Sequence, residues 1–392
     1  MKVEAVKAYR IPVEAPRDLI DAYFEVKKRA LREILTHVVY SRTGKAHLNF
    51  NAEDRRRLRN ELLRGWRYSK HYIDSAINSV IGLVKGWVKL YNKGRARSEP
   101  RITRRAVYVK TTLFTYRDGI LKISVEPRRR YLVVDLRRYD WVPRDFDEIG
   151  GLILTERELV IPFKKSVEPK AERWSSFDVN LTNVTALING EVVRYDLREL
   201  YHIHRVYEEK RRRLQRLAKH KPKTGKRLLE KYSRRERNRA RDFMHKLTAR
   251  IARELSELKS GAILEDLRDI KSRILHRSRR LNRSLSKWNA RIFQFMLEYK
   301  LKWLGLPVRY VDPRNSSRIC PVCQATMVAY RGRLLKCVEC SLILDRDVVA
   351  VLNLQMWGSG ATPKALLARL KGDDGETVDR SSPQMSMKVY QP

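Results

Sequence analysis

Four cysteines constrain the fold of this chain more than any other feature of its sequence. They are Cys320, Cys323, Cys337 and Cys340, and their spacing is Cys-x2-Cys-x13-Cys-x2-Cys. Each pair can form a turn that directs two thiolates toward one tetrahedral ion, most often zinc. A disulfide framework would instead distribute its cysteines along the chain. We therefore predict one structural Zn2+ site. Because a four-thiolate site is coordinatively closed, any catalysis must occur elsewhere.

The charge of the chain indicates its partner. Lys and Arg number 85 against 45 Asp and Glu, which gives a formal charge of +40 over 392 residues. Such an excess is costly in self-repulsion unless a polyanion binds, so we expect nucleic acid as the partner rather than a small-molecule substrate. No apolar run approaches the roughly 18 residues of a membrane-spanning helix. Residues 1–12 lack the apolar core of a secretory signal, so we expect a cytoplasmic protein without membrane contact.

The first 163 residues are predicted to form one domain. Residues 2–13 have the pattern of a strand, and the apolar spacing becomes helical from about 17 to 90. Between 106 and 161, short runs rich in Val, Tyr and Ile are separated by Gly and Asp turns, which is typical of a small β-barrel. We predict that the opening strand completes this barrel and that a helical region is inserted at about 16–100. Charged residues 164–173 are predicted to form a linker.

Residues 174–370 are predicted to form a second, α/β domain, so the fold class is α+β with two lobes. The order of elements resembles an RNase H-like sheet, and residues 371–392 have the composition of a disordered tail. The strand at 177–190 (FDVNLTNVTALING) ends in Asn189-Gly190, a favoured hairpin turn. The later elements are a return strand at 191–197, a basic helix at about 198–258, a strand at 261–267, helix at about 272–304, a strand at 308–312 and a helix at 347–357.

Three acids fall where such a sheet presents side chains at strand and helix ends. Asp178 lies inside an apolar strand, Glu265 ends a short apolar strand, and Asp347 begins the last apolar helix. Mg2+ prefers carboxylate oxygens, and two such ions about 4 Å apart can activate water and stabilise the leaving oxygen in phosphodiester hydrolysis. Each acid also has a structural alternative. Asp178 can be a hairpin edge residue, Glu265 can pair with Arg268, and Asp347 can cap a helix.

The second domain resembles TnpB, the nuclease encoded by compact bacterial and archaeal transposons and a relative of the small type V CRISPR effectors. Four motifs carry the resemblance: FDVNLTNVTAL and ILEDLRDIK for the first two RuvC motifs, DPRNSSRICPVC with KCVEC for the zinc ribbon, and LDRDVVAVLNL for the third RuvC motif. The resemblance implies that Asp178, Glu265 and Asp347 form one catalytic magnesium site in a RuvC-like nuclease domain. Asp345 is the alternative third acid, and the ribbon is placed at about 314–344.

The resemblance also implies an RNA-guided DNA endonuclease. Such a protein binds a guide RNA from the transposon end, recognises a short motif beside its target and cuts double-stranded DNA by metal-ion-assisted hydrolysis. Base pairing then supplies the sequence specificity. The basic helix from Lys210 to Arg250 is an expected phosphate contact. The single residues expected to contact nucleic acid are Tyr68, Lys70, Asn78, Ser79 and Lys85 in the helical insertion, and Arg318 before the first cysteine.

Three positions depart from the family pattern. Gln324 and Ser341 stand where the family usually has glycine after the second cysteine of each pair, so we expect less regular knuckles that still bind zinc. Val349 stands where the third motif commonly has asparagine, which is expected to remove a polar group beside the acids and weaken catalysis.

Two other functions account for parts of the sequence. A catalytically weak or inactive RNA-guided repressor would occupy DNA without cutting it, but such a protein is expected to lose one or more of the acids, and this chain keeps all three. A zinc-ribbon protein that binds structured RNA needs only the charge and the cysteines, so it leaves the acids unexplained. A strand-joining transposase is disfavoured, because the resemblance is to the nuclease that accompanies it.

Overall fold

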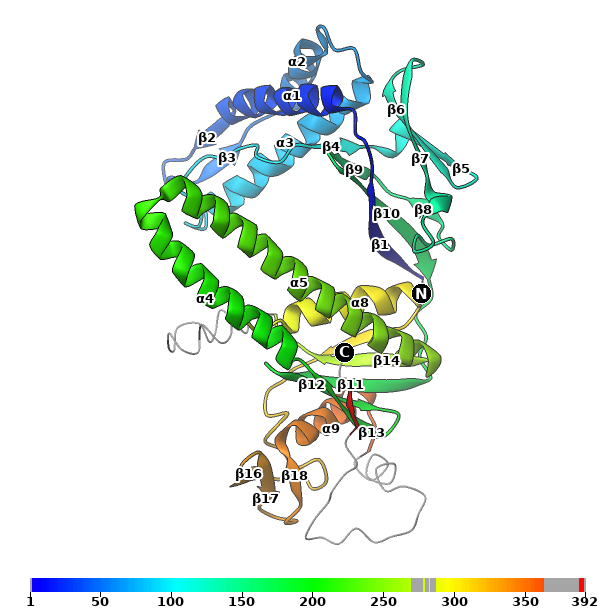
Figure 1. The fold of residues 1–392 in the computed structure, drawn as a ribbon, viewed down its shortest axis with the longest axis vertical. Helices are drawn as coiled ribbons and strands as arrows, with labels where there is room; N and C mark the ends of the chain where they lie inside the picture. The colour runs from blue at the N-terminus through cyan, green and yellow to red at the C-terminus, as the bar shows by residue number, and fades with distance from the viewer. Residues whose placement is uncertain (1, 269–277, 279–281, 283–286, 363–387, 391–392) are drawn as a thin grey trace. The chain divides into compact units, whose positions relative to one another are not determined.

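The computed structural model describes residues 2–268, 278, 282, 287–362 and 388–390 (Figure 1). The chain divides into two compact units. The amino-terminal unit comprises residues 6–166, and the carboxy-terminal unit comprises residues 167–392 together with the first five residues. Each unit has its own sheets and its own set of buried apolar residues.

A five-stranded sheet supports the amino-terminal unit. Its order is β1-β10-β9-β4, and β8 also pairs with β10. In β10, every second residue from Leu159 to Phe163 is fully buried, as expected for a strand with one face on an apolar core. The strands of this sheet are β1 (Val3–Pro12), β4 (Ala106–Val109), β8 (Glu148–Ile149), β9 (Leu152–Thr155) and β10 (Glu158–Val167). Three further strands of the unit, which lie between β4 and β8 in the chain, are β5 (Phe114–Arg117), β6 (Ile120–Glu126) and β7 (Arg130–Asp135).

The prediction of a β-barrel is wrong, because no sheet among the described residues closes on itself. The opening strand joins the sheet through β10, but β1 and β4 remain its two ends. The chain between β4 and β9 forms a separate antiparallel sheet, β5-β6-β7. The predicted barrel would have needed these strands to close. Sequence alternation identifies strands with one buried face, but it does not determine which edges pair.

Helices are inserted between β1 and β4, as the apolar spacing predicts. α1 packs on α3, where the hydroxyls of Tyr23 and Ser75 share a buried hydrogen bond of 3.1 Å. α2 begins with a capping box between Asn51 and Asp54. The hairpin β2-β3 escapes the sequence pattern because each of its strands has only 3 residues. The elements of this insertion are α1 (Arg17–Thr36), β2 (Val38–Tyr40), β3 (Ala46–Leu48), α2 (Ala52–Leu63) and α3 (Lys70–Tyr91).

A six-stranded mixed sheet forms the centre of the carboxy-terminal unit, in the order β15-β14-β11-β12-β13-β19. β11, β12 and β13 are antiparallel neighbours, whereas β14 runs parallel to β11 and β15 runs parallel to β14. The strands of the unit are β11 (Arg173–Val179), β12 (Asn183–Ile188), β13 (Glu191–Asp196), β14 (Ser260–Glu265), β15 (Val308–Val311), β16 (Met327–Arg331), β17 (Leu334–Cys337), β18 (Ile343–Asp345) and β19 (Lys388–Tyr390).

Two turns set the first three strands of this sheet. The predicted hairpin at Asn189-Gly190 is confirmed, with φ of 50° and 86° at the two residues. Residues 177–190 are not one strand, however, because β11 ends at Val179 and a short turn precedes β12. The amide of Asn180 donates to the carbonyl of Asn183 across this turn at 2.9 Å. The turn leaves Asp178 near the end of β11.

Helices cover both faces of the sheet (Figure 1). α5 and α8 share one apolar core with β11, β12 and β14, while α9 packs on the opposite face together with the cysteine segment. Two hydrogen bonds of 2.7 Å fix α9 on β11: the Ser176 hydroxyl donates to the carbonyl of Val351, and the Gln355 amide donates to that of Trp174. The helices are α4 (Arg198–His220), α5 (Pro222–Glu257), α8 (Ala290–Trp303) and α9 (Arg346–Ser359).

The basic stretch forms two helices rather than the single predicted one. α4 ends at His220, Lys221 leaves the helical conformation, and α5 begins at Pro222. Proline fits the first turn of a helix, but it cannot donate the hydrogen bond that a continuation of α4 would need. The two helices lie side by side (Figure 1). Gly225 permits their close approach, because a Cβ atom there would lie 2.5 Å from the Cα of Ala218.

The predicted linker, the second helical segment and the tail have boundaries that differ from the structure or lie outside the described residues. Residues 164–167 of the predicted linker extend β10 and Arg173 begins β11, so the irregular connection is residues 168–172. The predicted helix start at about 272 lies outside the described residues. Most of the predicted tail, residues 371–387 and 391–392, also lies outside them, but β19 pairs with β13 and is therefore ordered.

Gly358 allows α9 to lie close to β14. A Cβ atom at this position would be 2.6 Å from Cγ2 of Ile263, which is fully buried. We expect Gly358→Ala to lower the free energy of unfolding by about 1–3 kcal/mol, because a packed side chain must shift. Gly86→Ala in α3, where nothing lies within 4 Å, should raise it by roughly 0.5–1 kcal/mol. Chemical denaturation measures both, and a stabilising Gly358→Ala would contradict this packing.

Candidate active site

The three predicted acids lie around one cavity of about 700 Å3 in the carboxy-terminal unit. In the parallel pair β11-β14, Phe177 is opposite Leu264, so the next residues, Asp178 and Glu265, reach the end of the sheet together. Asp347 lies in the first turn of α9, which the hydrogen bonds to β11 hold on the same face. The sequence motifs are far apart along the chain, and the fold brings them together.

Burial and mutual repulsion disfavour the charged forms of these acids. The pKa of Asp178 is raised to about 7, first by burial and then by the charge of Asp347, although a hydrogen bond of 2.8 Å from the Asn180 amide opposes the rise. The pKa of Glu265 is raised to about 8, first by burial and then by the charge of Asp178. Burial also raises the pKa of Asp347. The cavity therefore holds three carboxyl groups that favour a compensating cation.

The structural alternatives for the acids can be compared with their actual contacts. Asp178 lies on an inner strand of the sheet rather than an edge, since β11 is between β14 and β12. Arg268 forms an ion pair with Asp266, the residue after Glu265. Asp345 is the helix cap: its carboxylate accepts a hydrogen bond of 2.8 Å from the backbone amide of Asp347.

Two arginines at this site were missed by sequence reasoning. Arg194 on β13 lies 3.7 Å from the Asp347 carboxylate and 3.4 Å from that of Asp345. Arg333, in the turn between β16 and β17, forms an ion pair with Asp347 and lies 3.6 Å from Asp345. Both arginines lower the pKa of Asp347 against the effect of burial. No local pattern marks these residues, because the contacts join segments that are distant in sequence.

Val349 does not line the cavity. Its side chain is fully buried in an apolar cluster with Cys320, Met327 and Leu344 of the cysteine segment. Valine at this position therefore contributes to the contact between α9 and the ribbon. The expectation that it removes a polar group beside the acids is not supported by this placement.

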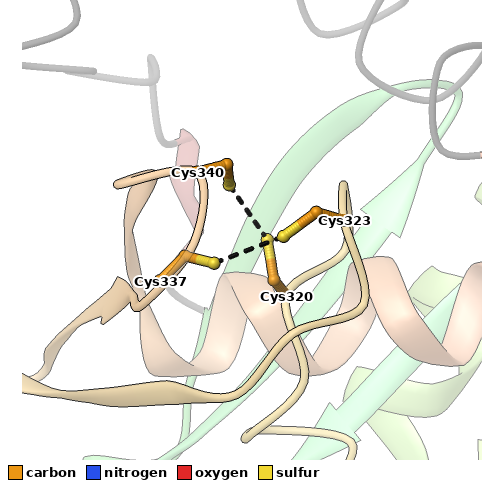
Figure 2. Close-up of side chains that lie close together, drawn as sticks. All are labelled: Cys320, Cys323, Cys337 and Cys340. Carbon is orange, nitrogen blue, oxygen red and sulfur yellow. Dashed lines mark hydrogen bonds between the residues drawn. The ribbon is translucent and has the colours of Figure 1, made fainter.

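The four cysteines converge as predicted (Figure 2). Their sulfur atoms all lie within 4.8 Å of one another, with 3.6 Å between Cys320 and Cys340 and 3.4 Å between Cys323 and Cys337. Tetrahedral zinc with bonds of about 2.3 Å separates thiolates by roughly 3.8 Å, so the cluster could hold one zinc ion. Cys320 and Cys337 are buried, while Cys323 and Cys340 face solvent.

The two missing glycines of the knuckles have a structural consequence. Gln324 and Ser341 adopt φ of 65° and 55°, in the left-handed region that favours glycine. Each knuckle therefore keeps the turn that a glycine would provide, at the cost of some backbone strain.

The residues predicted to contact nucleic acid do not form one group. Asn78 and Ser79 line a cavity of about 460 Å3 in the amino-terminal unit, together with the basic residues Lys27, Arg104 and Lys110. Lys70 and Lys85 are exposed elsewhere on α3, and Arg318 is exposed in the carboxy-terminal unit. Tyr68 is 7 % exposed and donates to Asp18 at 2.9 Å, so its hydroxyl has a partner within the fold.

The three basic residues of this cavity were not singled out from the sequence. Burial and the nearby charge of Arg104 lower the pKa of Lys27. This effect is typical of cations gathered without enough negative charge.

No helix among the residues that the structure describes is long and apolar enough to span a membrane.

Relief of strain at Ser341 should strengthen the zinc site. We expect Ser341→Gly to raise the stability of the ribbon by about 1 kcal/mol, because glycine adopts this φ without a Cβ clash. Ser341→Val should act in the opposite direction, since a branched side chain disfavours positive φ. A guanidinium titration in which a coloured chelator detects released zinc ranks the stability of the ribbon in the wild type and the two variants. Release that does not follow the order valine, serine, glycine would contradict the strain.

The raised pKa values predict a stability change with pH. Because the folded acids bind protons that the unfolded chain has lost, their contribution to stability falls as the pH rises from about 4 to about 8. Without added Mg2+, Asp178→Asn should therefore stabilise the protein at pH 8 by about 1–3 kcal/mol and have little effect near pH 4. Thermal unfolding measures both.

A neighbouring acid supplies the control for this experiment. The pKa of Asp266 is lowered to about 2, mainly by its hydrogen bonds from Arg268. Asp266→Asn should not stabilise the protein at pH 8, since it removes a favourable pair. Equal effects of the two substitutions would show that repulsion within the cavity is not the cause.

Family models match three segments of the chain. One described as "Probable transposase" matches residues 160–271, which include Asp178 and Glu265. One described as "Cas12f1-like, TNB domain" matches residues 291–354, which include the four cysteines and Asp347. A third, "Uncharacterized protein MJ0013 family", matches residues 19–124.

The fold is similar to that of a solved protein, in the cryo-EM structure of the Cas12f1-sgRNA-target DNA complex. The TM-score is 0.55 at 16 % sequence identity, and the match covers 86 % of this chain and 81 % of that chain. At this level of identity, the likeness shows a common fold alone.

Two proteins of Methanocaldococcus jannaschii are similar over most of their length. TnpB-like protein MJ0751 is 35 % identical over 275 residues, which are 66 % of this chain and 99 % of that protein. TnpB-like protein MJ1635 is 31 % identical over 374 residues, which are 91 % of this chain and 86 % of that protein. Similarity of this extent, together with the matched transposase and Cas12f1-like segments, shows that the chain belongs to the TnpB family.

Proposed function

We propose that this chain is a transposon-encoded, RNA-guided endonuclease that cuts double-stranded DNA at one RuvC-type site. The observation that carries the proposal is the position of Asp178, Glu265 and Asp347 around a single cavity. Carboxylates that repel one another across a cavity destabilise a fold, and such groups are typical of functional sites. The strand order and directions around them support an RNase H-like nuclease domain.

Magnesium fits this donor set, and Asp178, Glu265 and Asp347 would hold it. Carboxylate oxygens are the ligands that Mg2+ prefers. The raised pKa values support the assignment, because the arginines near Asp347 do not compensate the other two acids fully. When bound, the metal supplies an activated water and charge stabilisation for phosphodiester hydrolysis. The cysteine site would hold a structural zinc ion, whose four thiolates leave no open position for chemistry.

Other side chains of the cavity orient the acids and attract the substrate. The Asn180 amide donates to Asp178, and a side-chain hydrogen bond from Ser316 lowers the pKa of Glu265, so each of these acids has a polar partner at the cavity. The Trp288 indole donates to the carbonyl of Val179 at 2.8 Å and fixes one wall. The cavity is also lined by arginines suited to a phosphate backbone, namely Arg268, Arg314 and Arg346.

The proposed partners are a guide RNA and its double-stranded DNA target. The similar fold of Cas12f1 in complex with sgRNA and target DNA supports them, and so does the charge of +40. The basic faces of α4 and α5 are suited to contact the phosphates of a duplex, because few residues of either helix are buried before Ala240. Such contacts recognise backbone shape, while base pairing selects the sequence.

The cavity of the amino-terminal unit is the proposed site for the short motif beside the target. The Ser79 hydroxyl and the Asn78 amide can read base edges, although Oδ1 of Asn78 accepts from Arg55 at 2.7 Å in this structure. Lys27, Arg104 and Lys110 line the same cavity and can hold the neighbouring phosphates. Tyr68, Lys70 and Lys85 are not part of this proposed surface.

Cleavage of a plasmid library tests the function. The chain is co-expressed with RNA from its transposon end, and the purified complex is given plasmids with randomised bases beside the target. We expect Mg2+-dependent linear product that favours one adjacent motif, and a loss of at least about 1,000-fold for Asp178→Ala, because the site then lacks one ligand. Asp242→Ala is the control, since this acid lies on the surface of α5 and pairs with Lys246.

Three outcomes separate the possible functions. Cleavage by the wild-type and Asp242→Ala complexes, but not by Asp178→Ala, supports the endonuclease. Guide-dependent binding without any cleavage would overturn it and indicate an RNA-guided repressor. A purified chain that retains no RNA would contradict both.

A further inference from the structure

The segment that enters the zinc ribbon also touches the acidic cavity. This entry loop, residues 313–319, connects β15 to Cys320. Ser316 lies at its centre and is 5 % exposed. It lines the acidic cavity together with Glu265, and a side-chain hydrogen bond from it lowers the pKa of that acid. Cys320, only four residues later, belongs to the cysteine cluster. One short loop therefore carries a group that belongs to each site.

Asn353 of α9 fixes the entry loop. Its side chain is fully buried, and Nδ2 donates to the carbonyl of Ser316 and to that of Ile319, both at 2.7 Å. Oδ1 is buried without a hydrogen-bond partner among the described residues, so the polar role of this side chain is donation to the loop. The two carbonyls span the loop from the residue that contacts Glu265 to the residue before Cys320. Because α9 also carries Asp347, the helix that fixes the loop also holds one of the three acids.

The cysteine segment holds the far end of the loop. The amide of Cys320 donates to the carbonyl of Ala325, and the amide of Met327 donates to that of Arg318, both at 2.7 Å. Cys320 and Cys337 pack in one apolar cluster with Val348 and other residues of α9. A bound zinc ion would join the two knuckles to one another and keep this end of the loop fixed, whereas its loss would leave each knuckle with its own contacts alone.

We propose that Asn353 and Ser316 are positioning residues that couple zinc binding to the affinity of the acidic cavity for its divalent ion. This inference rests on the proposed function, since it takes Asp178, Glu265 and Asp347 as the magnesium ligands. The ribbon fixes the entry loop, the loop holds the Ser316 hydroxyl, and the hydroxyl orients the Glu265 carboxylate. Coupling between two sites is reciprocal, so each ion strengthens the binding of the other.

Mn2+ binding to the full chain tests the coupling without any cleavage assay. Mn2+ takes the same oxygen ligands as Mg2+, and electron paramagnetic resonance counts the free ion. Ser316→Ala should keep its zinc and lose about tenfold in Mn2+ affinity, as is typical when the partner of a ligating carboxylate is removed. Ser316→Thr, which retains a hydroxyl, should recover most of the loss. A merely structural role of this serine would not predict that recovery.

Two further variants test the route through the ribbon. Cys323→Ser removes a solvent-facing ligand, and the zinc-free protein should show a loss of Mn2+ affinity similar to that of Ser316→Ala. Asn353→Leu should weaken the binding of both ions, because the carbonyls of the entry loop lose their donor. If Asn353→Leu fails to fold, the two Ser316 variants still decide, since they leave the carbonyl that Asn353 binds unchanged.

Asp178→Ala separates this inference from the proposed function. If Asp178→Ala abolishes Mn2+ binding while Ser316→Ala and zinc-free Cys323→Ser bind Mn2+ like the wild type, the coupling is wrong and the acidic site stands. If Asp178→Ala also binds Mn2+ like the wild type, the acidic site itself is wrong. Weaker binding in Ser316→Ala and Cys323→Ser, with recovery in Ser316→Thr, supports the coupling.

Discussion

The parallel pairing of β11 with β14 is the constraint on which the acidic cavity depends. Phe177 and Leu264 are opposite one another and both belong to the core beneath α5 and α8. The residues that follow them, Asp178 and Glu265, must then face the other side, where α9 brings Asp347. A slip of one residue would turn Asp178 into the apolar core, so burial of the neighbouring residues keeps the register. The same apolar residues that fold the sheet therefore place its acids.

The cavity opposes the folding that creates it. Three carboxyl groups lie where burial and mutual repulsion raise their pKa values, and Asp347 has two arginines close by, one from β13 and one from the ribbon. The apolar cores on the two faces of the sheet supply the stability that offsets this repulsion. Enzymes commonly retain such unfavourable groups because the function needs them. The raised pKa values thus support the proposed magnesium site.

Local features of the molecule could be predicted from the sequence, and the reason is physical. The cysteines lie within one short segment, so their spacing alone restricts the geometry, and the Asn189-Gly190 turn depends only on its own two residues. The acids could be named because each lies in a recognisable motif. Their convergence depends on strand register, and no property of a single motif determines that register.

Contacts between segments that are distant in sequence could not be predicted, and the reason is the same for each. Arg194 and Arg333 meet Asp347 only after the sheet and the ribbon have formed, and the pairing of strand edges decides against a closed barrel in the same way. The break between α4 and α5 at Pro222 could have been predicted, since proline commonly begins a helix. The strong helical pattern on both sides favoured a single helix instead. Asn353 was not recognised because an asparagine within a helix is unremarkable in sequence until its buried hydrogen-bond partners are known.

The division of the basic stretch into α4 and α5 sets a length scale for what this pair of helices can hold. Between Pro222 and Arg239 the buried residues of α5 are Gly225 and Glu236, and both face α4. These 18 positions rise about 27 Å at 1.5 Å per residue. One turn of a B-form duplex is roughly 34 Å long. A duplex lying along this exposed part of α5 would therefore meet its cations over less than one turn of the double helix.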